Sequence, residues 1–202
     1  MIRAIVFDLG GVVFSEGKAV ALEQLARENG YDPERVNQVL YSPKSLELRR
    51  GLITDQEFWR WAQNQLPKNY DALLIKNVWY RGYILDEDIF QLIGELQEKY
   101  KIVAFSGNVK SRVDFLEERY GFRHLFDKEI YSFDHHLTKP DRKFVEVMVA
   151  QVGHRPEEIV YIDDNDSYTV AAREMKINVL IYARGQVERL RRELVALGVY
   201  PA

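Results

Sequence analysis

The pattern of hydrophobic and polar positions divides the chain into three stretches. Residues 2–7 form a largely apolar run that ends at Asp8, as is typical of a strand buried in a parallel sheet. From about residue 16 to about residue 84, apolar residues recur at helical spacing without a strand pattern. Short apolar runs then alternate with amphipathic helical segments up to the end. This alternation predicts an α/β fold built on a doubly wound parallel sheet.

The third stretch is expected to contain four more strands and five helices. The strands are predicted over residues 102–105, 129–132, 158–162 and 178–182. The helices are predicted over 86–100, 109–120, a segment entered through 138–141 and ending near 152, 167–175 and 185–197. Gly121, directly after the second of these helices, is a typical helix stop.

The helical stretch has its own start and stop signals. A helix over 19–29 is stopped by Gly30, and Asp32 followed by Pro33 starts the next one. A short helix is expected over 45–50, and Thr54 with Glu57 forms a capping box for another. A last helical pattern covers 71–80. We interpret residues 16–84 as an all-helical cap inserted into an α/β core made of residues 1–15 and 85–202, and expect it to lie over the carboxyl edge of the sheet.

Composition excludes several classes of function. The chain has 202 residues, 47% of them hydrophobic, a formal net charge of −3 and no cysteine. Disulfides, zinc–thiolate sites and thiol nucleophiles are therefore ruled out, and no general attraction to nucleic acid or to an anionic membrane is expected. No apolar stretch reaches membrane-spanning length and no signal-peptide pattern occurs, so a cytoplasmic protein is expected. The oligomeric state has no signature in the sequence.

Polar side chains stand at the ends of three predicted strands. They are Asp8, Ser106 and the pair Asp163–Asp164, and Lys139 precedes the proline before another helix. In a parallel sheet the carboxyl ends of the strands share one edge, where ligands bind. Carboxylate oxygens suit a hard cation such as Mg²⁺, and a lysine with a hydroxyl suits a phosphate. The set therefore predicts phosphoryl chemistry, with Asp8 as a candidate nucleophile.

These segments resemble the motifs of the haloacid dehalogenase-like (HAD) superfamily of hydrolases, with a helical cap inserted after the first motif. The resemblance covers nearly the whole chain, with four motifs in order: Asp8-Leu9-Gly10-Gly11-Val12, Ser106-Gly107-Asn108, Lys139-Pro140-Asp141 and Ile162-Asp163-Asp164-Asn165. The segment 50–58 also resembles the branch that includes bacterial sugar-1-phosphate phosphatases. The resemblance implies an enzyme that acts on a small phosphorylated molecule.

The resemblance also implies a metal site. Asp8 would be the nucleophile and form an aspartyl-phosphate. Its carboxylate, the backbone carbonyl of Gly10 and Asp164 would bind Mg²⁺. Asp163 would be a neighbouring acidic group or an outer-shell ligand of the metal.

A phosphate site is implied in the same way. Ser106 and Lys139 would bind the phosphoryl group, aided by the backbone amides after Asp8. Gly107 and Asn108 complete the second motif, with Asn108 the secondary candidate for a phosphate contact.

One position departs from the pattern of the phosphatases in the superfamily. They usually carry a second aspartate, which protonates the leaving group and later activates water, where this chain has Gly10. General acid–base catalysis is typically worth about 10² to 10⁴ in rate. We therefore expect a preference for leaving groups of low pKa, such as anomeric, acyl or aryl phosphates. Glu16 is the one substitute that we can name.

Two other functions stay open at this point. In a 2-haloacid dehalogenase the same aspartate attacks carbon without a metal, although Asp163–Asp164 is unfavourable there. The other alternative is a catalytically silent binding module, which would not need Asp8, Lys139 and Asp164 together.

The remaining conspicuous residues have structural interpretations. His135 and His136 are expected to be loop residues, and Asp166 a helix cap. Trp59, Trp61 and Tyr80 follow helical spacing and are expected in the core of the cap. Arg49 and Arg50 face either a charged substrate or water.

Overall fold

A parallel sheet forms the centre of the computed structural model, which describes residues 1–201. Its strands are β1 (Ala4–Phe7), β2 (Lys101–Ser106), β3 (Lys128–Tyr131), β4 (Ile159–Asp163) and β5 (Asn178–Ile181). They pair in the order β3-β2-β1-β4-β5, and every pairing is parallel. The doubly wound α/β fold predicted from the alternating pattern is therefore confirmed.

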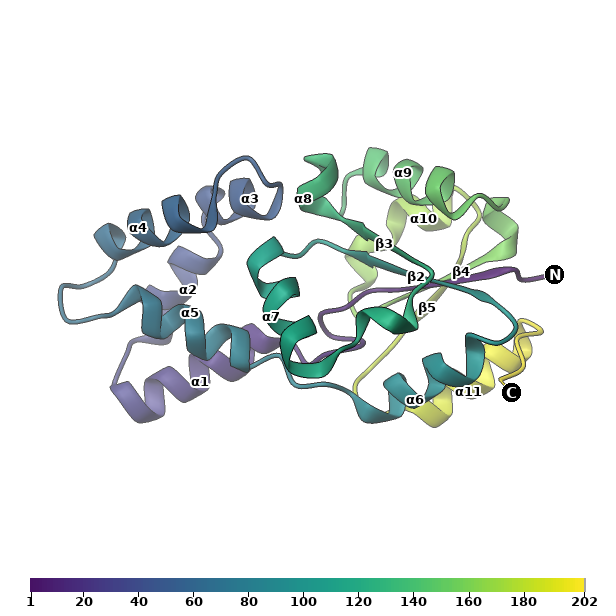
Figure 1. Cartoon of the computed structure of the whole chain (residues 1–202), viewed down its shortest axis with the longest axis horizontal. Coiled ribbons are helices and arrows are strands. Elements are labelled where there is room, and N and C mark those ends of the chain that lie inside the picture. The colour runs from purple at the N-terminus through teal and green to yellow at the C-terminus, as the bar shows by residue number, and fades with distance from the viewer. Residues whose placement is uncertain (202) are drawn as a thin grey trace.

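Helices cover both faces of this sheet (Figure 1). One face packs against α6 (Glu87–Leu96), α7 (Lys110–Tyr120) and α11 (Val187–Ala196), and the other against α9 (Arg142–Val152) and α10 (Val170–Glu174). Along β1 the side chains alternate between the two layers: Ile5 and Phe7 enter one core, Ala4 and Val6 the other. All four are fully buried, which explains why this strand is hydrophobic without a break.

Several element boundaries differ from the prediction. Helix α6 ends at Leu96, because residues 97–99 form a turn, and α10 starts only at Val170, after a short 3₁₀ helix at Asp166–Tyr168. Asp166 pairs with Arg173, and the cap at this turn is the Asn165 side chain, so the prediction for Asp166 was wrong. A four-residue helix, α8 (Ser132–His135), was not predicted.

Five helices occupy the stretch between β1 and α6. They are α1 (Gly17–Asn29), α2 (Pro33–Leu40), α3 (Pro43–Arg49), α4 (Asp55–Gln65) and α5 (Ala72–Arg81). Figure 1 shows this helical block beyond the carboxyl ends of the strands. Asp32 caps α2, and Thr54 with Glu57 forms the predicted capping box at α4. Helix α3 begins earlier than expected, since Ser42 caps it and Pro43 occupies its first turn.

The helical block has an aromatic core of its own. Phe58, Trp59, Trp79 and Tyr80 are buried, and their rings meet in edge-on and tilted contacts, while Trp61 packs against Phe58. The packing role expected for the tryptophans and Tyr80 is therefore confirmed. None of the helices described is long and apolar enough to cross a membrane.

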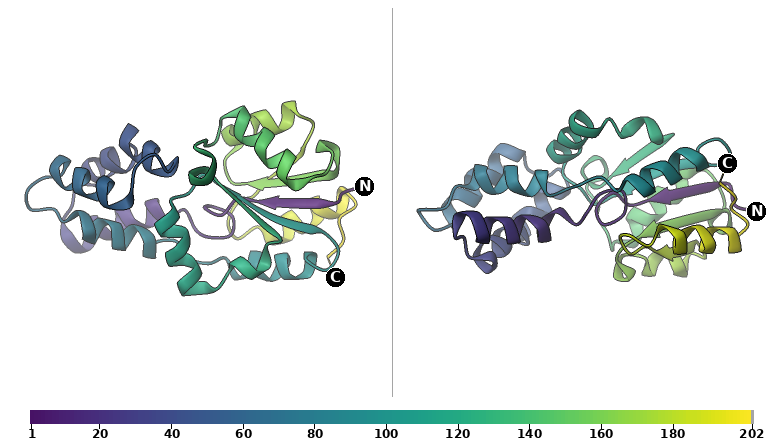
Figure 2. Two further views of the ribbon diagram at one scale, coloured as in Figure 1. Left: turned by 45° about the horizontal axis from the view of Figure 1, so that its top comes forward. Right: turned by 90° about the horizontal axis from the view of Figure 1, so that it is seen from below.

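Two short segments connect the helical block to the sheet and run side by side (Figure 2). The Ser15 amide donates to the Ile84 carbonyl at 2.8 Å, and the Ser15 hydroxyl donates to the Gly82 carbonyl at 2.6 Å. Gly82 itself leaves no room for a side chain, because a Cβ there would lie 2.4 Å from the Gly17 carbonyl oxygen. This close backbone contact requires glycine.

We expect Gly82→Ala to lower the free energy of unfolding by about 1–3 kcal/mol, since backbone must shift to admit the methyl group. The measurement is a urea unfolding curve. Gly94→Ala is the matched control, because Gly94 is exposed inside α6 with open space around its Cα. In this control the free energy of unfolding should rise by about 0.5–1 kcal/mol, because alanine favours the helix more than glycine does. An unchanged midpoint for Gly82→Ala would contradict the close contact.

Candidate active site

The carboxyl edge of the sheet brings the predicted polar residues together. Phe7 in β1 is level with Ala104 in β2 and Ile162 in β4, so the three strands end side by side. Asp8 follows β1 directly, and Lys139 reaches the same edge from the loop before α9. The Lys139 Nζ lies 3.1 Å from Asp8 Oδ1 and 2.7 Å from Asp163 Oδ2.

The Lys139 ammonium group is buried at this edge. It lies 5.0 Å from the centre of the Phe105 ring and 5.2 Å from the centre of the Tyr161 ring. Burial opposes its charge, but the Asp163 and Asp8 carboxylates outweigh burial and raise the pKa of Lys139 above its usual value. Lys139 is therefore a fixed positive charge beside Asp8.

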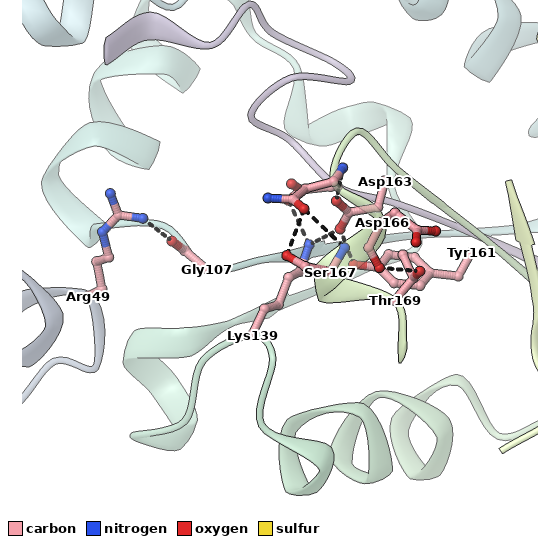
Figure 3. A network of polar contacts seen from close by, with 10 residues as sticks. Arg49, Gly107, Lys139, Tyr161, Asp163, Asp166, Ser167 and Thr169 are labelled. Atoms are coloured by element: carbon pink, nitrogen blue, oxygen red, sulfur yellow. Dashed lines mark hydrogen bonds and ion pairs between the residues drawn. The ribbon is translucent and has the colours of Figure 1, made fainter. Parts of the chain in front are cut away.

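Asp163 is fully buried and its oxygens are already engaged (Figure 3). Oδ2 accepts hydrogen bonds from Lys139 and from the Tyr161 hydroxyl, and Oδ1 accepts from the Asn165 amide at 2.9 Å. Although burial alone would raise it, the pKa of Asp163 lies below its usual value because Lys139 and these hydrogen bonds outweigh burial. Of the two roles that the resemblance implies, this geometry favours that of an acidic neighbour, in which Asp163 holds Lys139.

Asp164 lies against the loop after Asp8; the residue as a whole is exposed, but its carboxyl group is partly buried. A Cβ on Gly11 would lie 2.1 Å from the Asp164 carboxyl carbon, and Gly11 has a φ of +84°. Both facts restrict this position to glycine. The bare backbone at Gly11 thus lets the Asp164 carboxylate approach the loop that carries Asp8.

Three carboxylates form an acidic cluster at this edge. One oxygen each from Asp8, Asp163 and Asp164 can be chosen so that all lie within 4.8 Å of one another. Burial raises the pKa of Asp8 to about 6, with Lys139 partly offsetting it. Burial and the charges of Asp8 and Asp163 raise the pKa of Asp164 to about 7.

This cluster fits a hard divalent cation. Apart from its ion pair with Lys139, the buried Asp8 Oδ1 atom has no hydrogen-bond partner within the described residues. Mutual repulsion between carboxylates is relieved when a cation lies among them, and oxygen donors are the ligands that Mg²⁺ prefers. Asp8 and Asp164, together with the Gly10 carbonyl predicted beside them, are the residues that would hold it.

A cavity of about 330 Å³ opens in front of Asp8. Both the sheet edge and the helical block line it. The sheet edge contributes Asp8, Gly10, Ser106, Gly107, Asn108, Arg112, Thr138, Lys139, Asp164, Asn165 and Tyr168. The helical block and its connections contribute Glu16, Lys18, Ala19, Tyr41, Arg49 and Tyr83. The predicted phosphate residues therefore share one cavity with the nucleophile candidate.

The second motif also organises helix α7. Asn108 is buried, and its Oδ1 accepts from the Val109 amide at 2.8 Å and from Arg112 Nε at 2.6 Å. Ser106 is buried beside Asp8, and its hydrogen bond is one of the smaller effects that lower the pKa of Asp8. Asn108 thus has a clear structural task in addition to the phosphate contact predicted for it.

The two arginines left open by the sequence have different positions. Arg49 lines the cavity, and its Nη1 donates to the Gly107 carbonyl at 3.4 Å (Figure 3). Arg50 does not line the cavity; its carbonyl oxygen lies 2.8 Å from His136 Nδ1. His135 contacts Gln151 instead. His135 is the last residue of α8 and His136 follows it, so the prediction of a loop was wrong for His135. Neither histidine lines the cavity.

Sequence reasoning missed Lys18, Tyr41, Tyr83, Arg112 and Tyr168 as cavity residues. None belongs to a motif, and helical spacing does not show which residues of a separate block face the sheet. For Arg112, its position four residues after Asn108, at the start of a predicted helix, was an available signal.

A parallel α/β sheet with an acidic, lysine-containing cavity at its carboxyl edge defines a hydrolase-like architecture. The family model of haloacid dehalogenase-like hydrolases matches residues 2–175. The chain therefore belongs to this family and is a hydrolase.

Other proteins are similar to this chain over nearly its whole length. An uncharacterized protein of Dictyostelium discoideum is 40% identical, over 93% of this chain and 94% of its own length. The enolase-phosphatase E1 of Aquifex aeolicus is 26% identical, over 93% of each chain. A HAD family enzyme of Bacteroides thetaiotaomicron, crystallised with magnesium and inorganic phosphate, has a TM-score of 0.76 at 22% identity, over 92% of this chain and 96% of its own.

The raised pKa of Asp164 predicts a pH-dependent stability cost. Below the usual value of 3.8, Asp164 is protonated in both the folded and the unfolded state and costs nothing. Between about pH 4 and about pH 7 Asp164 is ionised in the unfolded chain but largely protonated in the folded one, so the folded state loses stability over this range, and the loss is complete above about pH 7. Without divalent cations, Asp164→Asn should therefore raise the free energy of unfolding by about 1–2 kcal/mol near pH 8. This value is smaller than the pKa shift alone would give, because solvent screens a partly exposed carboxylate.

The measurement is urea unfolding in chelator at about pH 8 and at about pH 4. At the lower pH the gain in the free energy of unfolding should disappear. Asp166→Asn is the matched control, because its exposed ion pair with Arg173 should be worth less than about 1 kcal/mol at either pH. A gain for Asp164→Asn of equal size at both pH values would rule out ionisation as its cause.

Proposed function

We propose that the protein is a Mg²⁺-dependent phosphatase that acts through an aspartyl-phosphate on a small phosphorylated molecule with a good leaving group. The observation that carries the proposal is the buried Lys139 ammonium, 3.1 Å from Asp8 and beside the acidic cluster. The phosphate-bound enzyme of Bacteroides thetaiotaomicron and the enolase-phosphatase of Aquifex aeolicus give support from similar proteins.

The residues divide the reaction between them. An Asp8 carboxylate oxygen attacks phosphorus and displaces the leaving group, and water then hydrolyses the acyl phosphate. Lys139 and Ser106 bind the phosphoryl oxygens and offset their charge, while Asp163 fixes the Lys139 ammonium. A divalent cation at Asp8 and Asp164, when bound, offsets the negative charge between nucleophile and phosphate.

The dehalogenase alternative has less support. It needs an ionised Asp8 without a metal, yet burial and the Asp163 charge raise the pKa of Asp8. Burial and the charges of Asp8 and Asp163 likewise raise the pKa of Asp164. A carboxylate substrate would add a further negative charge to that repulsion. The silent binding module also has less support, since holding the buried Lys139 between two carboxylates serves no evident purpose in a scaffold.

The preference for a good leaving group follows from the surroundings of Gly10. A Cβ at this position would lie 3.4 Å from Tyr83 Cε1 and 4.0 Å from the Tyr83 hydroxyl. The ring of Tyr83 therefore stands beside the place where the second aspartate of related phosphatases would project. Glu16 lines the same cavity and stays the candidate for a proton carrier.

We expect aryl or anomeric phosphates to be hydrolysed at least ~10²-fold faster than primary alkyl phosphates, because no acid assists the poor leaving group. The measurement is kcat/KM for both substrate types with Mg²⁺. Chelator should abolish both activities, and Asp8→Asn should lower them by at least ~10³-fold. Equal rates on the two types would refute the leaving-group preference, and activity that survives chelation would refute the metal-dependent mechanism.

Gly10→Asp should raise turnover of alkyl phosphates by about 10-fold or more, since it restores a proton donor. Gly10→Ala is the control for added volume, because a Cβ there meets only ordinary van der Waals contacts. The alanine variant should keep the wild-type ratio of aryl to alkyl rates. An unchanged ratio in Gly10→Asp as well would count against the account of this position.

A further inference from the structure

Arg112 carries a buried positive charge that no carboxylate in the described part of the chain contacts, although the charge of Glu16 acts on it from farther away. Its residue is 1% exposed, in the first turn of α7. Among residues 1–201 no carboxylate lies within 4.0 Å of it, whereas the other buried cation of the cavity, Lys139, has two. A buried charge is normally paired, because leaving water without compensation is costly.

The guanidinium group is held rigidly by uncharged groups. Its Nε donates to Asn108 Oδ1 at 2.6 Å. Its central carbon lies 4.5 Å from the centre of the Trp79 ring and 4.4 Å from that of Tyr83. These rings come from α5 and from the connection that follows it, so the helical block closes over the guanidinium group. Arg112 is therefore fixed in place before any ligand binds.

One edge of the guanidinium group is left without partners. The Nη1 atom is buried and donates to no acceptor among the described residues. Burial lowers the pKa of Arg112, yet guanidinium groups stay protonated in proteins. Arg112 also lines the cavity that contains Asp8, together with the cationic Lys18 and Arg49. An unsatisfied, preoriented donor at this place points to an anionic ligand.

We propose that Arg112 binds a carboxylate on the leaving-group side of the substrate, so that the substrate class is phosphorylated carboxylic acids. This inference rests on the proposed phosphatase function and deepens it. With Nε committed to Asn108, the Nη1–Nη2 edge matches the two oxygens of a planar carboxylate. The phosphoryl group already has Lys139 and Ser106, so Arg112 is available for a second anion.

The test compares 3- and 4-carboxyphenyl phosphate with the corresponding neutral carboxamides, which have similar aryl leaving groups. With Mg²⁺, the wild-type kcat/KM should favour at least one carboxylate isomer over its amide by at least ~10-fold. Arg112→Gln should lower kcat/KM for that carboxylate by on the order of 10²-fold and for its amide by less than about 3-fold. Arg119→Gln, an exposed change on the same helix, is the control and should leave both values unchanged.

Other outcomes overturn the proposal in distinguishable ways. Equal wild-type activity on acid and amide for both isomers would exclude a carboxylate site while leaving the phosphatase function intact. An equal loss on both substrates in Arg112→Gln would show that Arg112 serves the phosphoryl group or the shape of the cavity.

A binding experiment tests the carboxylate site without a variant that could fail to fold and without depending on the proposed reaction. Calorimetric titration of the wild-type protein with 3- and 4-hydroxybenzoate should give tighter binding than with the hydroxybenzamides. If none of the four phosphates is hydrolysed but the hydroxybenzoates still bind more tightly, the phosphatase function is refuted and the carboxylate site is retained. Absence of the preference in both the kinetic and the binding experiment would refute the site.

Discussion

The ion pairs of Lys139 are the interaction on which the site depends. The Lys139 ammonium group lies between Asp8 and Asp163 at the end of the sheet. The two carboxylates and the ammonium group compensate one another's buried charges. Without Lys139 two buried carboxylates would repel each other, and without Asp163 the lysine would lose its nearest partner. Because Asp163 receives further hydrogen bonds from Tyr161 and Asn165, the pair is anchored in β4 and the loop after it.

The parallel register of the strands makes this arrangement possible. Asp8 directly follows β1, level with Asp163 at the end of the neighbouring strand β4, although 155 positions separate the two residues in the chain. Asp164 follows β4, and the absence of a side chain on Gly11 leaves room for its carboxylate at the same edge. Backbone geometry, rather than any single contact, therefore concentrates the acidic groups at one edge.

Much of this arrangement was predictable from the sequence, because it depends on local patterns and on the topology of parallel sheets. The run before Asp8 predicted β1, and Thr54 with Glu57 predicted the start of α4. The acidic residues and Lys139 could be grouped because strand ends share an edge. Helix lengths were less accurate, as with α6, since turns compete with helix at the ends.

The sequence could not reveal the surroundings of Arg112. On an amphipathic helix an arginine is expected to face solvent, and this one is buried because Trp79 and Tyr83 close over it from a distant segment. The same holds for Tyr83, whose position beside Gly10 depends on the path of the connection after α5. Contacts between elements far apart in sequence have no local signature.

Two parts of the chain line the cavity, and they differ in how easily their residues can be substituted. The strand ends supply the groups that surround Asp8, and any change there disturbs a packed sheet. Lys18, Tyr41 and Arg49 come instead from separate helices, or the turn after one, in the inserted block. Evolution could therefore exchange these three side chains, and with them the shape and charge of one wall of the cavity, while inheriting the strand ends unaltered.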